Sequence, residues 1–168
     1  MASRVRLRTS KNDFPKMKKS IEDLNGLKLN VGVGGENGWL ASIHEYGCRI
    51  PVTPKMRAFL HHKGLHLKAS TTEIVIPERS FLRAGFDANH DRVLRDAENV
   101  LPDVLIGTMS TEQYARMVGL LLSTAIKEYA RNLREPANHP FTVQRKGSSN
   151  PLVDTGNMIN SITYEVEE

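Results

Sequence analysis

The residues best suited to acid–base or nucleophilic chemistry lie close together, between positions 44 and 48. His44 and Glu45 are adjacent, and a histidine beside a carboxylate can in principle transfer a proton near neutral pH. Cys48 follows His44 by four residues, but Gly47 ends the predicted helix before the two could share one face as a nucleophilic pair. The sequence offers neither a second constellation nor a candidate oxyanion hole. It therefore favours packed or exposed side chains here and predicts a protein that is not an enzyme.

Two further patterns are typical of ligand sites but fail in their spacing. His61, His62 and His66 lie near one another, yet no cysteine or carboxylate cluster accompanies them as zinc ligands would require. Residues 32–38 are rich in glycine between a predicted strand and a predicted helix, where a phosphate-binding loop would lie. The third glycine of that motif falls on Asn37, so a plain turn is favoured. We expect no metal and no cofactor.

Composition indicates one ordinary globular domain. The chain has 168 residues, 39% of them hydrophobic and 25% charged, and a domain of this size buries enough surface to fold without a metal or disulfide. The lone Cys48 cannot form an internal disulfide, which favours a reducing compartment. No apolar run approaches the roughly 18 residues of a membrane span, and no apolar secretory signal is visible. We expect folding in the cytoplasm and no membrane partner.

The positive charge gathers near the N-terminus. Residues 1–19 hold seven lysines and arginines against Asp13, a net charge of +6, so the rest of the chain sums to −2 from the total of +4. Alternation of arginine with apolar residues from position 4 to 8 predicts an extended arm over residues 1–12. Such a segment suits DNA phosphates or an acidic protein surface, although a solvated terminus fits as well. The candidate contact residues are Arg4, Arg6, Arg8, Lys16, Lys18 and Lys19.

Hydrophobic periodicity predicts an α+β domain over residues 13–168. Alternation of apolar residues over 27–33 and again over 162–166 predicts two strands that pair and close a small antiparallel or mixed sheet. Helical spacing predicts short helices over 14–25 and 39–46. The weaker pattern of residues 48–72 predicts an inserted flap with a short helix near 55–60 and a strand over 72–76.

A turn at Pro77 separates these elements from a mostly helical half. Asp87 is a candidate cap for one helix, which Pro102 interrupts. Ser110 and Gln113 form a capping-box signature before a long amphipathic helix, whose apolar face should cover the sheet. A polar connection over 137–150 and one helical turn over 157–160 lead into the closing strand.

Three short elements together resemble a known family. Residues 41–47 read Ala-Ser-Ile-His-Glu-Tyr-Gly and resemble the A-x-I-H-E-Y/F-G element of phage tail-completion, or neck, proteins. Residues 76–83 resemble that family's I-P-x-R-x-F-L-R element, and residues 151–162 resemble its P-L-x-D-T-G-x-L/M-x-x-S-I element. In many relatives the D-T-G element comes first, whereas here it comes last, which suggests a particular branch.

The resemblance implies a structural virion protein with a tail-terminator-like fold. Such a subunit assembles with its copies into a ring, usually a hexamer, that joins the tail tube to the head connector, with passing contact to the genomic DNA. It is made in the host cytoplasm and ends in the virion. The alternative is a nucleic-acid-binding module that uses the basic N-terminal segment.

The resemblance also gives structural roles to individual residues. Gly47 and Gly156 would allow tight turns, and Asp154 or Thr155 would cap the helix that follows. Phe81 and Leu82 would anchor the central turn. The two arginines of this turn, Arg79 and Arg83, would meet acidic groups such as Glu45 in the same or the next subunit, or remain solvated. The residues expected to serve assembly are His44, Glu45, Tyr46, Gly47, Pro77, Arg79, Phe81, Leu82, Arg83, Asp154, Thr155 and Gly156.

Overall fold

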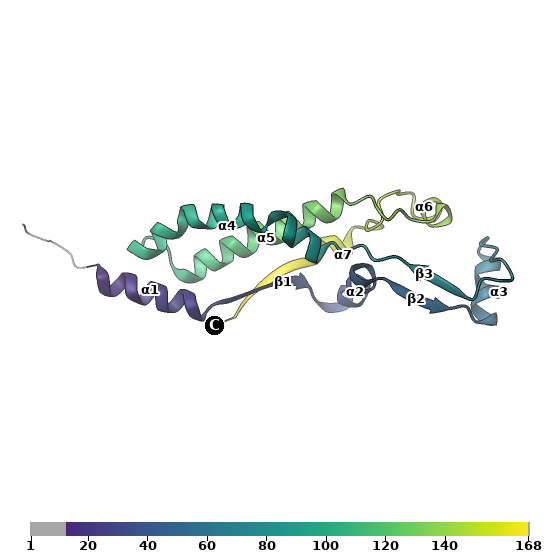
Figure 1. The fold of residues 1–168 in the computed structure, drawn as a ribbon, viewed down its shortest axis with the longest axis horizontal. Helices are drawn as coiled ribbons and strands as arrows, with labels where there is room; N and C mark the ends of the chain where they lie inside the picture. Colours follow the sequence, from purple (N-terminus) through teal and green to yellow (C-terminus); the bar gives the residue numbers. More distant parts are fainter. Residues whose placement is uncertain (1–12, 168) are drawn as a thin grey trace, which may run out of the picture.

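The structure is a computed structural model that describes residues 13–167. These residues form an elongated α+β fold, with a helical body at one end and a thin projection at the other (Figure 1). The elements in chain order are α1 (Phe14–Gly26), β1 (Lys28–Val33), the 3-10 turn η1 (Gly35–Asn37), α2 (Gly38–Tyr46), β2 (Cys48–Pro51), α3 (Pro54–His62), β3 (Glu73–Ile76), α4 (Leu82–Ile106), α5 (Thr111–Asn132), α6 (Pro140–Lys146), α7 (Asn157–Asn160) and β4 (Ile162–Glu167).

The strands form two separate antiparallel pairs, where we expected one small sheet. The predicted pairing of β1 with β4 is confirmed, with Lys28 opposite Glu167 and Val33 opposite Ile162. Within the described part of the chain, β2 and β3 pair with each other and not with β1 or β4, because α2 carries the chain away from β1 before β2 begins. With α3 they form the flap, which runs on to Ile76 and projects from the body (Figure 1).

Helix α5 covers the β1–β4 sheet, as its apolar face predicts. The capping box at its start is complete, because the Ser110 hydroxyl accepts from the Gln113 N–H and the Gln113 side chain accepts from the Ser110 N–H, each at 3.1 Å. Gly119 allows the close approach of the helix to the sheet. A Cβ at this position would lie 2.4 Å from the Tyr164 ring and 2.9 Å from a Leu29 methyl carbon.

Helix α4 differs from the prediction both at its start, expected at Asp87, and at Pro102, where an interruption was expected. It begins at Leu82, one turn before the predicted cap Asp87, and it continues through Pro102 to Ile106. Pro102 is exposed near the C-terminal end of the helix, where it removes one backbone hydrogen bond and its ring meets solvent. The helix ends where Gly107 adopts a left-handed conformation at φ +81°.

A further helix, α6, lies in the segment that the polar composition predicted to be an irregular connection. Pro140 occupies its first turn, and His139 Nδ1 accepts from the Phe141 N–H at 3.2 Å. The ring nitrogen thus supplies a cap that residue-type preferences do not favour.

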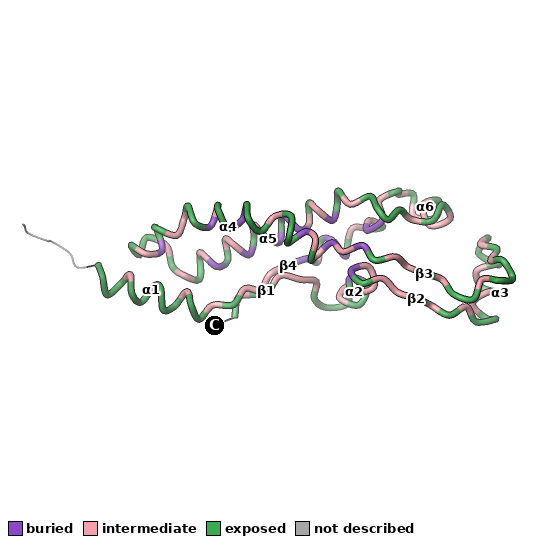
Figure 2. Tube along the Cα trace, viewed as in Figure 1, coloured by how far each residue is buried: buried purple, intermediate pink, exposed green. Residues whose placement is uncertain are grey.

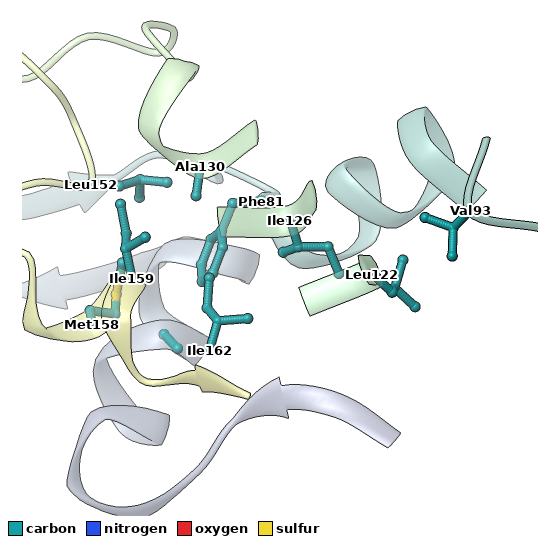
Figure 3. Packing of buried hydrophobic residues seen from close by; sticks show 10 residues of the cluster. Phe81, Val93, Leu122, Ile126, Ala130, Leu152, Met158, Ile159 and Ile162 are labelled. Atoms are coloured by element: carbon teal, nitrogen blue, oxygen red, sulfur yellow. The ribbon is translucent and has the colours of Figure 1, made fainter. Parts of the chain in front are cut away.

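The core lies where α4 and α5 meet α7 and the start of β4. Phe81, Ile126, Ile159 and Ile162 are its largest fully buried apolar side chains (Figure 3). Buried residues follow the inner faces of the long helices, whereas the flap is largely exposed (Figure 2). Because α1 and α3 contain no fully buried residue, both ends of the molecule depend on a central core.

Candidate functional site

Residues 41–47, 76–83 and 151–162, the three elements singled out in the sequence, meet at one place, which we call the junction. It comprises the C-terminal end of α2, the turn from Pro77 to Arg83 and the segment from Pro151 to Ile162. The junction lies where the flap leaves the body (Figure 1).

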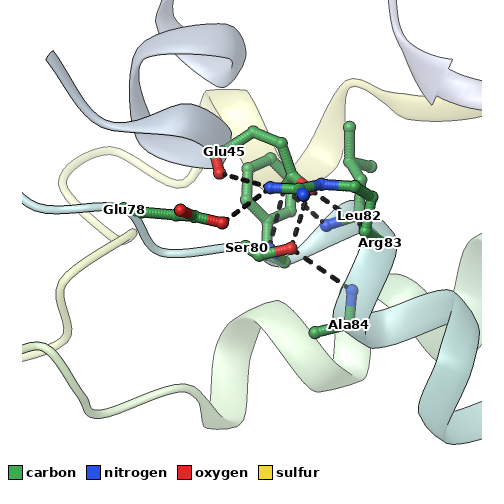
Figure 4. Close-up of polar contacts among 7 residues, drawn as sticks. Glu45, Glu78, Ser80, Leu82, Arg83 and Ala84 are labelled. Atoms are coloured by element: carbon green, nitrogen blue, oxygen red, sulfur yellow. Dashed lines mark hydrogen bonds and ion pairs between the residues drawn. The ribbon is translucent and has the colours of Figure 1, made fainter.

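Glu45 on α2 caps helix α4 from a distant part of the sequence. Its side chain is almost completely buried, and Oε2 accepts the backbone N–H groups of Phe81 at 2.8 Å and Leu82 at 2.9 Å. Oε1 accepts the Ser80 hydroxyl at 2.8 Å and the Arg83 N–H at 3.1 Å (Figure 4). A carboxylate at the positive end of a 25-residue helix satisfies donors that the helix itself leaves free.

These contacts keep Glu45 ionised. Burial acts to raise the pKa of the Glu45 carboxyl, but hydrogen bonds from Leu82, Arg83 and Ser80 outweigh burial and hold the pKa below its ordinary value. A buried carboxylate whose oxygens are already engaged by these donors is suited to fixing two segments together.

Arg83 completes the contact, as expected for an arginine that meets Glu45 in the same subunit. Its Nε donates to Glu45 Oε1 at 2.9 Å, and its Nη2 donates to Glu78 at 2.7 Å and to the Glu45 carbonyl at 3.1 Å. Its guanidinium carbon lies 4.9 Å from the centre of the Tyr46 ring, so the arginine also covers an exposed aromatic side chain.

Arg79 behaves differently: within residues 13–167 it meets no acidic group, so the expected contact inside the same subunit is wrong. Its Nε donates to the Pro136 carbonyl at 2.6 Å, and its Nη2 donates to the Ala137 carbonyl at 3.1 Å and to Asn138 Oδ1 at 3.2 Å. Its backbone N–H donates to the His44 carbonyl at 2.7 Å. The side chain is only 4% exposed, so Arg79 joins the turn to the loop before α6 from within the protein.

Gly47 lets α2 pass against the turn at Pro77. Its φ of +72° and ψ of 173° lie in a region that side chains make inaccessible. A Cβ here would lie 2.8 Å from the Glu78 nitrogen and 3.2 Å from the Pro77 carbonyl carbon. The predicted tight turn is confirmed, and the close approach explains the glycine.

The third element closes the junction through apolar contacts. Phe81 is fully buried in the cluster that contains Ile159 and Ile162, with Leu82 packed against it (Figure 3). Phe81 therefore anchors the turn, as expected.

The turn before α7 uses its glycine as predicted, but its side chains differ from the expected cap. Gly156 adopts φ +85° and is itself the N-cap residue, which has no side chain to accept a hydrogen bond. Asp154 is exposed, and Thr155 Oγ1 lies 3.4 Å from the Asn157 nitrogen, near the long limit for a hydrogen bond.

Only some of the basic residues predicted to contact DNA or an acidic partner lie within the described range. Arg4, Arg6 and Arg8 lie outside them, while Lys16, Lys18 and Lys19 are exposed on α1. Lys18 lies 3.6 Å from Glu22 one turn later. The structure therefore leaves the proposed DNA or acidic-partner contact as a prediction.

The histidines considered as metal ligands do not form a ligand set. His61 and His66 contact each other edge to face, with ring centres 4.4 Å apart, and both are exposed. Within residues 13–167, no group of three or more histidine, cysteine or acidic side chains is placed to hold a metal ion. In the same range, no helix is long and apolar enough to cross a lipid bilayer.

Comparison of the chain with models of protein families, with curated proteins and with solved structures finds no match.

Proposed function

We propose that the chain is a structural subunit of the tailed-phage neck, where copies form a ring that joins the tail tube to the head connector. The observation that carries the proposal is the convergence of the three family-like elements on one junction. The side chains of Glu45, Arg79 and Arg83 form hydrogen bonds within the chain. That arrangement suits residues that fix the shape of a subunit better than residues that act on a substrate.

The apolar surface of the described residues also supports an assembly role. Trp39 is 73% exposed, Tyr46 65% and Phe59 55%, which is much aromatic surface to leave in water. Phe86 and Leu94 on α4 border an open groove of about 430 Å³ between α4, α5, α1 and β1. In a ring, one face of each subunit meets a different face of its neighbour, and this groove is the face that we assign to such a contact.

Light scattering on the full-length protein, alone and mixed with tail-tube and connector proteins, tests the proposal. We expect a closed oligomer, visible as a ring by electron microscopy, in at least one of these samples. A protein that stays monomeric and binds none of the partners would contradict the assignment, as would its absence from finished virus particles.

A second candidate, nucleic-acid binding, is favoured by the exposure of Lys16, Lys18 and Lys19 along α1. Phosphate contacts release counterions, so affinity for duplex DNA should fall steeply with salt. Removal of residues 1–11, combined with replacement of Lys16, Lys18 and Lys19 by glutamine, should abolish binding in this case. Flat salt dependence, or no binding at low salt, would exclude this function.

A further inference from the structure

A second pocket lies beside the junction, between the flap and α6. Its volume is about 570 Å³, and it is partly open to solvent. Leu65 and Ile74 of the flap line one wall, and Phe141 and Thr142 of α6 line the other. The walls are therefore mainly apolar.

Arg79, which also lines this pocket, is a buried cation that has no acidic partner among residues 13–167. It forms no ion pair with a carboxylate of the described residues, and its acceptors are two carbonyl groups and an amide oxygen. Burial lowers the pKa of its guanidinium, and no described carboxylate acts in the other direction. A buried charge that lacks a counter-charge is costly, which makes this position favourable for an anion.

His44 lines the same pocket and has an unsatisfied polar atom. Its Nδ1 is buried and meets no hydrogen-bonding atom of the described residues. Burial, followed by the positive charges of Arg79 and Lys146, lowers the pKa of His44 to about 4, so the ring is neutral at pH 7. His139 also lines the pocket, and Asp154 is the acidic group that acts on Lys146. The charges that face His44 are thus positive.

One edge of β3 borders the pocket. Among the strands of residues 13–167, β3 pairs with β2 alone, and the consecutive residues Ile74, Val75 and Ile76 all line the pocket. Side chains of consecutive strand residues point to opposite faces, so a pocket that touches all three must lie along the strand edge. That edge offers backbone donors and acceptors to an added extended segment.

We propose that this pocket binds an extended acidic segment of a partner protein, with one carboxylate placed against Arg79 and His44. The segment lies along the free edge of β3, and its apolar neighbours contact Leu65, Ile74 and Phe141. Apolar walls and a strand edge suit a polypeptide better than a nucleic-acid phosphate. The site does not depend on whether the chain forms a ring.

A pair of capped peptides tests the proposal on the full-length protein. Acetyl-Val-Glu-Val-amide and its neutral match acetyl-Val-Gln-Val-amide are titrated while the His44 ring resonances, assigned with His44→Gln, are followed by NMR. We expect the glutamate peptide to shift these resonances and to raise the His44 pKa, because a nearby anion stabilises the protonated ring. The glutamine peptide should bind roughly tenfold more weakly or worse, since it lacks a charge-assisted hydrogen bond.

Two variants locate the site. Thr142→Trp should fill the pocket and abolish the His44 response, whereas Thr124→Trp, at an exposed position on α5, should not. Arg79→Met should abolish binding by removing the cation; if it does not fold, the tryptophan pair decides. Equal responses to both peptides, no response at millimolar concentrations, or a full response in Thr142→Trp would overturn the proposal. Inorganic phosphate that shifts His44 as strongly as the glutamate peptide would exclude recognition of a polypeptide.

Discussion

Replacement of Glu45 by glutamine tests whether one buried carboxylate holds the flap, the turn and helix α4 together. Glutamine keeps the shape of the side chain but has one acceptor oxygen, and its NH2 group would face other donors. If the amide nitrogen takes the place of Oε2, the N–H groups of Phe81 and Leu82 lose their acceptor. The opposite orientation removes the acceptor of three donors, namely the Ser80 hydroxyl, the Arg83 backbone N–H and Arg83 Nε. Since at least two buried or partly buried donors lose their acceptor in either orientation, we expect a loss of about 3 kcal/mol in the free energy of unfolding.

Urea denaturation followed by circular dichroism measures this loss, with Glu128→Gln as the matched control. Glu128 is exposed on α5 and makes no hydrogen bond or ion pair with the described residues, so its replacement should change stability by less than about 0.5 kcal/mol. A loss below about 1 kcal/mol for Glu45→Gln, or one equal to that of the control, would refute the assignment of Glu45 as the cap of α4.

The pH dependence gives the same test a second readout. Because folding lowers the pKa of Glu45, its stabilisation is fully present above the unfolded-state value near 4.5 and is lost as the pH falls through the folded-state value. The difference between wild type and Glu45→Gln should therefore stay constant around neutral pH and shrink in acid. A difference that grows as the pH falls would contradict this reasoning.

The other expected outcomes concern packing and assembly. Gly47→Ala should lower the free energy of unfolding by about 3 kcal/mol or more, because φ is +72° and the new Cβ would meet backbone at 2.8 Å. Gly26→Ala, with open space around it, should be neutral or slightly stabilising in the same urea assay. Gly119→Ala should cost about 2 kcal/mol, because its Cβ would lie 2.4 Å from a tyrosine ring of β4. Phe86→Glu with Leu94→Glu should reduce the oligomer in light scattering while leaving the unfolding midpoint almost unchanged, since both side chains are about half exposed.

Elements with strong local signals could be predicted from the sequence. The alternation over residues 27–33 and 162–166 indicates the strands β1 and β4, and their predicted pairing is confirmed. The start of α5 follows from Ser110 and Gln113, because a capping box is local to four residues. The positions of the two strands and of this helix start required no knowledge of the rest of the chain.

Features that depend on distant residues could not be predicted in this way. Asp87 is a candidate cap because aspartate favours that position, whereas the helix begins at Leu82, where Glu45, 36 residues before Phe81, accepts its first N–H groups. The resemblance implies an acidic partner for Arg79 or a solvated side chain, yet its acceptors are the carbonyls of Pro136 and Ala137 and the amide oxygen of Asn138. Every residue has a backbone carbonyl, so no pattern of residue types could have indicated that Arg79 would bind these two.

The same long-range contacts explain why the three sequence elements belong together. The flap has a two-stranded sheet and a helix without a fully buried residue, so packing within the flap does not set its direction. Its two connections to the body run through Gly47 on one side and through Pro77 to Arg83 on the other, and Glu45 binds the second connection to the first. In the proposed ring, the angle between subunits is fixed by symmetry, and a small error in each copy would prevent closure. A buried carboxylate with several fixed donors holds such an angle more firmly than an exposed ion pair does, which is a reason for placing glutamate, glycine and arginine at this junction.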